Sequence, residues 1–463
     1  MDTSSSFPPD SDLDFSFTSV STDATTSTSS ARTSLSLSDF QPLSSSSSHT
    51  RPLPLPHRSS DPAWAPIQTL SPLSPPLSFS NLHIVRHLGS GDSGRVYQCR
   101  LEGFDYALKV VDRDAPSVKE KARAKGGGGG GRWEEAEVLG ELDHPFLPTL
   151  YGRIEAGRHS CVLIDYCPGG DLHRLRARQP GGRFGINAVR FYAAEVLVAL
   201  EYLHALGIVY RDLKPENVLL RENGHIMLSD FDLSFKSNVT PKLHFRTNSG
   251  GTNLEDFTQA CCFSHPQSSI DWLPQFMAEP EGAHSRSYVG THEYLAPEII
   301  SGEGHGAGVD WWALGVFIYE LLYGRTPFKG PTKKATLKNI LSKPLRWPES
   351  GEDHVSGEIL AVMDLIKRLL TKDPRRRLGF EKGACEIKEH PFFRSIRWPL
   401  IRSIPPPRVH LLRPHRTVSA PAGNSMRMAG KLAGKRRSWS GSNLLGSHSL
   451  RRASLFSKWF SWW

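Results

Sequence analysis

The feature that most constrains this chain is the run Tyr210–Asn217, which is followed further along by an acidic side chain at Asp230. Within the run, Asp212 can accept a proton from a hydroxyl group, and Lys214 can neutralise charge on a phosphate in transit. Asn217 and Asp230 present oxygen atoms of the kind that Mg²⁺ prefers. A chance match of the whole run, with Asp230 just past a hairpin signal, is negligible. The sequence therefore predicts a phosphoryl-transfer site with Asp212 as proton acceptor and Asn217 and Asp230 as metal ligands.

A glycine-rich run, Leu88–Val96, lies nearer the N-terminus and carries glycines at the spacing G-x-G-x-x-G. By itself this pattern is weak, because it also opens dinucleotide-binding folds, where a helix follows the glycines. Here a second β-like run, Tyr106–Val111, follows instead, as in a strand–loop–strand unit that covers nucleotide phosphates. ATP and Mg²⁺ are therefore the predicted cofactors. The loop residues predicted to contact ATP are Leu88, Gly89, Ser90, Gly91, Asp92, Ser93, Gly94, Arg95 and Val96.

Lys109 lies within that second apolar run and is the predicted cation for the α- and β-phosphates of ATP. A lysine in an apolar strand needs a carboxylate partner, and Glu135 on a predicted short helix, 133–142, is the best candidate. Glu134 and Glu137 lie close by and are alternatives. A run of six glycines, 126–131, separates the strand from this helix. We interpret it as a flexible surface expansion, the alternative being a weaker pairing of Lys109 with Glu135.

Composition divides the chain into a globular middle and two polar ends. Residues 1–80 contain 24 Ser and 11 Pro, which leaves too little apolar surface to offset the entropy of ordering, so we predict a disordered arm. Residues 82–167 show short β-like runs, and residues 168–393 are mostly helical in pattern. Apolar positions in 187–206 recur at spacings of three and four, and 311–322 is strongly apolar. The predicted fold class is α+β, with a β-rich small lobe and a helical large lobe.

Two further patterns refine the large lobe. The apolar runs Val218–Leu220 and His225–Leu228 flank Asn223-Gly224, which is a strong hairpin signal. Glu298 and Arg377 each sit in a run that we interpret as architecture, and we predict a buried ion pair between them.

The basic charge belongs to the C-terminal tail, 394–463. Residues 401–463 carry 12 Lys or Arg and no Asp or Glu, and Trp459, Phe460, Trp462 and Trp463 end the chain. This combination suits contact with anionic lipid at a membrane surface, while a solvated arm is the alternative. The six cysteines show no metal-ligand spacing, and no run is long and apolar enough for a membrane span. We expect a cytoplasmic protein with peripheral attachment to the plasma membrane, possible entry to the nucleus, and no nucleic-acid partner.

Residues 82–393 resemble a eukaryotic protein kinase domain over its whole length. The acids at 171, 216 and 320 and the run Thr291–Glu298 resemble the AGC group of Ser/Thr kinases. An insert, 236–284, and Asp232 in place of the usual glycine after Asp230-Phe231 resemble its plant-specific branch. The runs Asp165–His173 and Phe191–His204 are similar to the PINOID and WAG kinases, and the Ser-rich start favours the WAG type.

The resemblance implies several roles for single residues. The backbone of Ile164–Cys167 would bind adenine, with Asp165, Cys167 and Asp171 in the ATP-binding set. Asp171, Glu216 and Glu320 would select Arg upstream of the target hydroxyl. A phosphate on Ser287, or on Ser285, would pair with Arg211 and order the activation loop after action by an upstream kinase. The side chains expected to stack between the lobes are Leu139, Leu150, Tyr210 and Phe231.

The resemblance also implies substrates. The family phosphorylates cytosolic loops of auxin-efflux carriers, so protein substrates of this kind are expected. Ser438 and Ser454 follow basic residues and are predicted autophosphorylation sites. Asp tolerates left-handed backbone better than most residues, so we expect activity despite Asp232. A catalytically weak scaffold and a lipid-binding regulator acting through the tail are the alternatives.

Overall fold

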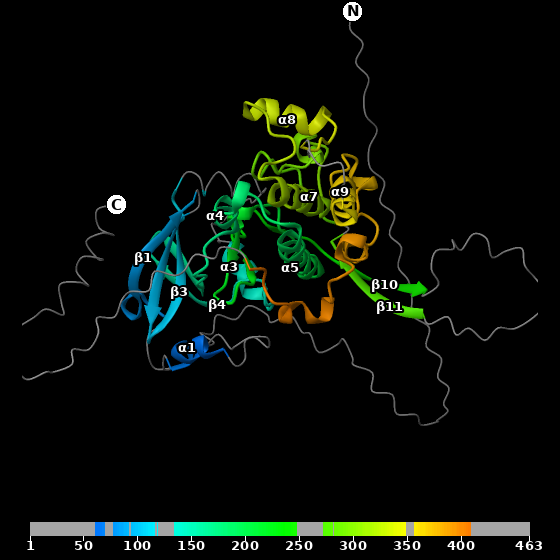
Figure 1. Ribbon diagram of the computed structural model, residues 1–463. Coiled ribbons are helices and arrows are strands. Elements are labelled where there is room, and N and C mark those ends of the chain that lie inside the picture. The colour runs from blue at the N-terminus through cyan, green and yellow to red at the C-terminus, as the bar shows by residue number, and fades with distance from the viewer. Residues whose placement is uncertain are drawn as a thin grey trace, which may run out of the picture. The chain divides into compact units, whose positions relative to one another are not determined.

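The computed structural model describes residues 61–69, 77–91, 94–115, 118, 134–247, 272–280, 282–348 and 356–408 (Figure 1). Several predictions fall outside these residues: Asp92 and Ser93 of the glycine-rich loop, the six glycines, the tail beyond Arg408 with Ser438 and Ser454, and residues 1–60.

The small lobe is built on a five-stranded antiparallel sheet with the order β1-β2-β3-β5-β4. The central strand β3 has a neighbouring strand at each edge, so Lys109 pairs with Val96 on β2 and with Val162 on β5. The short helix α3, Glu134–Glu141, lies between β3 and β4 in the chain, as the sequence predicted. The strands are β1 His83–Ser90, β2 Arg95–Leu101, β3 Phe104–Asp112, β4 Leu150–Ala156 and β5 His159–Asp165.

The last part of the predicted disordered arm differs from that expectation, because residues 61–69 fold onto the small lobe. They form a 3₁₀ turn, Pro62–Trp64, and the short helix α1, Ala65–Thr69, and the Asp61 carboxylate caps the turn by accepting from Ala63 N–H at 2.9 Å. Trp64 is only 2% exposed, and its ring centroid lies 5.0 Å from that of Tyr151. Average composition over 80 residues hides this apolar cluster, which gains enough burial to order the segment.

Trp64→Ala is expected to lower the free energy of unfolding of the small lobe by about 3–5 kcal/mol, because it empties a buried aromatic site. Urea unfolding followed by circular dichroism measures the change. Leu360→Ala, at a side chain 56% exposed, is the control and should change stability by less than about 0.5 kcal/mol. A loss below about 1 kcal/mol for Trp64→Ala would mean that the segment is not held by its tryptophan.

The large lobe is helical and packs around two helices, α5 Ile186–Ala205 and α7 Gly308–Tyr323, which are in contact with each other. Every side chain of α7 from Val309 to Leu322 is buried, as its apolar run predicted. The predicted hairpin forms from β7 and β8, and Gly224 in its turn has φ of 85°, a conformation that glycine adopts without strain. The α+β two-lobed fold is thus confirmed. The helices are α4 Leu172–Ala177, α5 Ile186–Ala205, α6 Pro297–Ser301, α7 Gly308–Tyr323, α8 Lys333–Ser342, α9 Gly357–Leu369 and α10 Gly383–Lys388, and the short strands are β6 Ile208–Val209, β7 Val218–Leu220, β8 Ile226–Leu228 and β9 Phe235–Lys236.

The insert, 236–284, contains a hairpin that the sequence did not predict. Strand β10, Thr240–Thr247, pairs with β11, Trp272–Glu279, in a continuous antiparallel register from Thr240↔Glu279 to Thr247↔Trp272. Strand β11 contacts α5 and α10, and Figure 1 shows the hairpin leaving the large lobe beside these helices. The base of the insert is therefore part of the large lobe.

The predicted C-terminal tail begins as a packed segment. A 3₁₀ turn, Trp398–Ser403, buries Ile401, and the Lys388 ammonium lies 5.2 Å from the centre of the Trp398 ring. Among the described residues, no helix has both the length and the apolar character needed to cross a bilayer.

Candidate active site

The glycine-rich loop is a tight turn between β1 and β2. Ser90 pairs with Arg95, and Gly91 N–H donates to the Gly94 carbonyl at 2.9 Å. A Cβ on Gly94 would lie 2.2 Å from the carbonyl oxygen of Val110 on β3, so any side chain there would push the loop away from the strand. Glycine at this position therefore lets the loop pass directly over the strand that carries Lys109.

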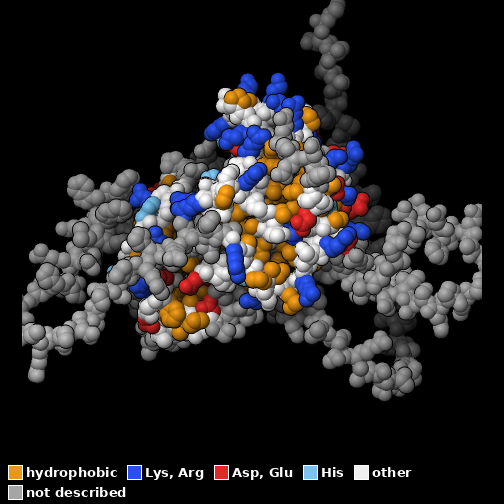
Figure 2. Space-filling view, in the orientation of Figure 1, with side chains coloured by type: hydrophobic (Ala, Val, Ile, Leu, Met, Phe, Trp, Pro, Cys, Tyr) orange, Lys and Arg blue, Asp and Glu red, His pale blue; other side chains and the backbone are white. Residues whose placement is uncertain are grey.

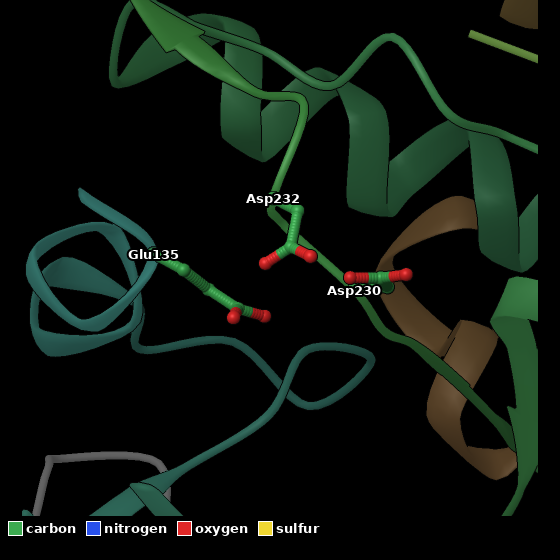
Figure 3. A group of neighbouring side chains, drawn as sticks. All are labelled: Glu135, Asp230 and Asp232. Carbon is green, nitrogen blue, oxygen red and sulfur yellow. The ribbon is translucent and has the colours of Figure 1, made fainter. Parts of the chain in front are cut away.

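Three carboxylates converge on Lys109 from two parts of the chain. Its ammonium lies 2.8 Å from Glu135 on α3, 2.9 Å from Asp230 and 3.1 Å from Asp232. Figure 3 shows Glu135 reaching from the helix toward the two aspartates, and one carboxylate oxygen from each of the three lies within 4.8 Å of the other two. The structure thus selects Glu135, rather than the exposed Glu137, as the partner of Lys109. A cluster of hard oxygen donors of this kind fits a divalent cation.

The cluster keeps Lys109 charged. Burial lowers the pKa of its ammonium, but the negative charges of Asp230, Glu135 and Asp232 outweigh this effect and hold the pKa well above its usual value. Burial and the two aspartates raise the pKa of Glu135 well above its usual value, although Lys109 opposes the shift. A charged lysine on the strand that the glycine-rich loop crosses is suited to bind phosphate oxygens.

Asp232 has a role that sequence reasoning missed. We expected the left-handed backbone of this segment at Asp232, but it occurs at Asp230, which has φ of 62°. Asp232 is absent from the described non-glycine residues with positive φ, and its side chain is only 7% exposed and faces Lys109. Replacement of the usual glycine therefore adds a third carboxylate around the lysine and causes no backbone strain.

The loop after β6 brings Asp212, Lys214 and Asn217 together. Lys214 Nζ donates to the Asp212 carboxylate at 2.7 Å, and the Asn217 amide nitrogen donates to the same carboxylate at 2.8 Å. Thr291, in the same run as Glu298, donates to Asp212 at 3.1 Å and accepts from Lys214 at 3.1 Å. Burial raises the pKa of Asp212, with Lys214 opposing the shift. A fixed carboxylate with a raised pKa is a better proton acceptor for a hydroxyl group than an exposed one.

Arg211 joins this loop to the activation segment. It has φ of 67°, and its guanidinium donates to Ser287 Oγ at 2.6 Å and to Ser285 Oγ at 3.1 Å. The structure therefore brings both predicted phosphosites to the predicted arginine. Burial and the positive charge of Arg211 lower the pKa of the neighbouring His305 to about 4, so this histidine is neutral at pH 7.

The backbone of the loop is held by Asp310 on α7, a contact that was not predicted from the sequence. Its carboxylate accepts from Tyr210 N–H at 2.9 Å and from Arg211 N–H at 2.8 Å. The available signal was an acid at the start of a strongly apolar buried helix. The same carboxylate contacts His204 Nε2 at 2.9 Å, while His204 Nδ1 lies 2.8 Å from Glu279.

His204 makes stability depend on pH. Burial lowers its pKa, but Glu279 and Asp310 outweigh burial and raise the pKa to about 10, against 6.5 for an exposed histidine. Because the folded state binds this proton more tightly, the stabilisation is complete below pH 6.5 and is lost as pH rises to about 10. Urea unfolding at several pH values in this window should show a falling free energy of unfolding. Glu279→Gln should flatten the fall, and an equal slope in both proteins would contradict the assignment.

The remaining predicted residues are placed as follows. The Asp165 carboxylate turns away from the hinge, accepting from Thr149 N–H at 2.7 Å and from Arg221 at 3.1 Å, so only its backbone is available to adenine. Cys167 Sγ lies 3.8 Å from Met227 Sδ. The rings of Tyr210 and Phe231 are 5.3 Å apart, in the same core cluster as Leu139 and Leu150.

The three acids predicted to select substrate arginines have partners within the chain. Asp171 caps α4 by accepting from Arg174 N–H at 2.7 Å. Glu216 lies 3.0 Å from His173, and Glu320 is buried, 3.1 Å from Arg176. Burial raises the pKa of Glu320, and the charge of Glu216 adds to the shift, which places these two acids in one electrostatic region. Their role in substrate selection stays a prediction.

The site combines a glycine-rich hairpin above a lysine–carboxylate pair with a loop that carries a buried aspartate and an asparagine. This combination is typical of two-lobed phosphotransferases that use a nucleotide. The protein kinase domain model matches residues 82–393, and the chain belongs to this family. The chain is 52% identical over 364 residues to the serine/threonine-protein kinase WAG2 of Arabidopsis thaliana, covering 76% of this chain and 73% of that protein.

Two other relatives agree with this placement. Serine/threonine-protein kinase WAG1 of Arabidopsis thaliana is 48% identical over 411 residues, with 86% of this chain and 83% of that protein covered. Protein kinase PINOID of Oryza sativa subsp. japonica is 50% identical over 374 residues, with 76% and 74% covered. The chain is therefore a Ser/Thr protein kinase of the plant AGC group, similar to the WAG and PINOID kinases, and requires ATP and a divalent metal ion.

Proposed function

We propose that this kinase uses Mg-ATP to phosphorylate Ser or Thr in basic contexts on the cytosolic loops of auxin-efflux carriers. The convergence of Glu135, Asp230 and Asp232 on Lys109 is the observation that carries the catalytic part of this proposal. The substrate part is supported by the resemblance to the PINOID and WAG kinases and by the acids at 171, 216 and 320.

In the proposed reaction, each described side chain has one task. Lys109 binds the α- and β-phosphates, and Glu135 holds Lys109 in the direction of the nucleotide. Asp230 and Asn217 hold Mg²⁺, which neutralises negative charge on the phosphates when it is bound. The backbone of the hinge, Ile164–Cys167, binds adenine.

The acceptor hydroxyl is handled by the loop after β6. Asp212 accepts its proton, and Lys214 stabilises negative charge on the transferred phosphoryl group. Thr291 fixes both side chains through its hydroxyl, which contacts Asp212 and Lys214 at 3.1 Å. Asp171, Glu216 and Glu320 attract arginines upstream of the acceptor, which favours basic substrates.

Activation follows phosphorylation of Ser287, or of Ser285, by an upstream kinase. The proposal is supported by the hydrogen bonds that the Ser285 and Ser287 hydroxyls accept from the Arg211 guanidinium. A phosphate at either site would form charge-assisted hydrogen bonds with Arg211, and this would order the activation segment beside the catalytic loop.

The site of action is the cytoplasmic face of the plasma membrane, with cytoplasm and nucleus as further locations. The basic aromatic tail, 394–463, attaches to anionic lipid, and autophosphorylation of Ser438 or Ser454 weakens the attachment. A second positive surface supports the proposal, because exposed Lys333, Lys334 and Lys338 gather over α8 (Figure 2). Deleting residues 431–463 should move a fluorescent fusion from the cell periphery to the cytosol, and unchanged peripheral signal would contradict the role of the tail.

The substrate is tested by transfer of labelled phosphate from Mg-ATP to a purified cytosolic loop of an auxin-efflux carrier. We expect incorporation that disappears when the acceptor serines of the loop are replaced by Ala. Labelling of a generic basic peptide without labelling of the loop would overturn the substrate and leave the kinase activity intact.

A further inference from the structure

We propose that Glu279, at the end of the insert hairpin, is a positioning residue that fixes the catalytic loop through His204 and Asp310. The insert would then be a structural part of the active site as well as a connection. The proposal rests on the phosphoryl-transfer activity of the chain and does not depend on which protein is the substrate.

The Glu279 carboxylate lies in a site formed by two helices, α5 and α10. One carboxylate oxygen lies 2.8 Å from Nδ1 of His204 near the end of α5, and the other accepts from Ala384 N–H on α10 at 3.2 Å. Gly383 makes room for it, because a Cβ at that position would lie 1.9 Å from the carboxylate oxygen. Gly383 also has φ of 54°, which other residues rarely adopt. Space, hydrogen bonds and charge therefore all favour an acid from the insert at this point.

The partner of Glu279 is fully buried and connects directly to the catalytic loop. His204 has no exposed surface and bridges Glu279 to Asp310, which is equally buried. Asp310 in turn accepts from the backbone N–H groups of Tyr210 and Arg211 at 2.9 and 2.8 Å. Asp212 follows immediately in the chain. Four side-chain and backbone contacts thus link the insert to the loop that carries the proposed proton acceptor.

The charge of Glu279 keeps the His204 ring in one hydrogen-bonding arrangement between Glu279 and Asp310. With a carboxylate at each ring nitrogen, His204 is held as an imidazolium that donates to both acids, consistent with its raised pKa. Without Glu279, the ring is left with one carboxylate, Asp310, and with an unsatisfied buried Nδ1. A neutral ring then has two tautomers, and only one of them donates to Asp310. We expect the loss of this constraint to displace the catalytic loop, where a shift of about 1 Å can cost about 10²-fold in rate.

The base of the hairpin is packed firmly enough to hold Glu279 in place. Met277, two residues earlier on β11, is 4% exposed, and β11 contacts both α5 and α10. Thr240 at the start of β10 pairs with Glu279, which places the acid where the hairpin joins the large lobe. The Lys109 cluster lies on other elements, so nucleotide binding should not depend on Glu279.

The test compares kcat and the KM for ATP in full-length variants, normalised by the fraction of protein that binds ADP. Glu279→Ala should lower kcat at least about tenfold and leave the KM for ATP within about twofold. Glu279→Gln keeps an oxygen that accepts from Nδ1–H but removes the charge, so its kcat should lie between those of Glu279→Ala and the unchanged protein at pH 7. Glu303→Ala, at an exposed acid on the loop before α7, is the matched control and should change neither constant.

A double variant separates positioning from general destabilisation. If the acid acts through His204, adding His204→Phe to Glu279→Ala should lower kcat no further than His204→Phe alone. If Glu279→Ala unfolds, Glu279→Met can be used instead, because methionine fills the same space without a carboxylate. The same loss of kcat is expected for Glu279→Met. The proposal is overturned by an unchanged kcat in Glu279→Ala and Glu279→Met, by additive losses in the double variant, or by a loss that disappears after normalisation to ADP binding.

Discussion

Replacing Asp212 by Asn is expected to lower kcat by about 10²–10⁴-fold, because it removes the proposed proton acceptor for the substrate hydroxyl. The asparagine keeps the shape of the side chain, so the contacts with Lys214 and Thr291 are altered while the loop stays in place. ATP binding should remain within about threefold of the unchanged protein, since the Lys109 cluster lies on β3, α3 and the segment after β8.

Steady-state transfer and nucleotide binding, measured on the same samples, check this result. Asp105→Asn on the outer part of the small lobe is the control, because Asp105 pairs with Arg100 at a half-exposed site. Its kcat should stay within about twofold. An Asp212→Asn enzyme with nearly full kcat would show that the proton is accepted elsewhere.

Arg377→Ala is expected to lower the free energy of unfolding by about 3–5 kcal/mol, since it leaves the buried Glu298 carboxylate without its partner. The guanidinium makes two parallel hydrogen bonds to that carboxylate, at 2.7 and 2.9 Å, and its side chain is 1% exposed. It also donates to the carbonyl oxygens of Thr371 and Gly308, so one substitution disrupts several contacts.

Urea unfolding of the full chain measures this loss. Arg368→Ala is the matched control, because Arg368 forms an ion pair with Asp364 while 58% exposed, and surface pairs contribute about 0–1 kcal/mol. A loss for Arg377→Ala no larger than that of the control would mean that the pair does not stabilise the large lobe.

The parts of the site that could be predicted from sequence are those set by short-range spacing. Asp212, Lys214 and Asn217 lie in one loop, and the hairpin signal at Asn223-Gly224 fixes where Asp230 follows. The pairing of Lys109 with Glu135 was predictable in a different way, because a lysine in an apolar strand needs an acid and the short helix that follows the strand carries one.

Contacts between distant segments were not predictable, because they depend on how the elements pack. Nothing local to Asp232 indicates that it reaches Lys109, and nothing local to Glu279 indicates that Gly383 leaves room for it. Thr291 appeared architectural because its contact with Asp212 spans the activation segment. The folded segment at 61–69 was hidden for another reason, since a prediction from average composition ignores one tryptophan and its local partners.

The most direct test of the account is transfer of labelled phosphate from Mg-ATP to a basic serine-containing peptide, comparing the unchanged protein with Lys109→Ala and Asp230→Ala. With Lys109 and Asp230 intact, we predict clear transfer once an upstream kinase has activated the protein, or once Ser287→Glu has been introduced as a substitute for the phosphate. In the same activated background, transfer should be lost in both variants. Undiminished transfer in either variant would contradict the site described for this kinase.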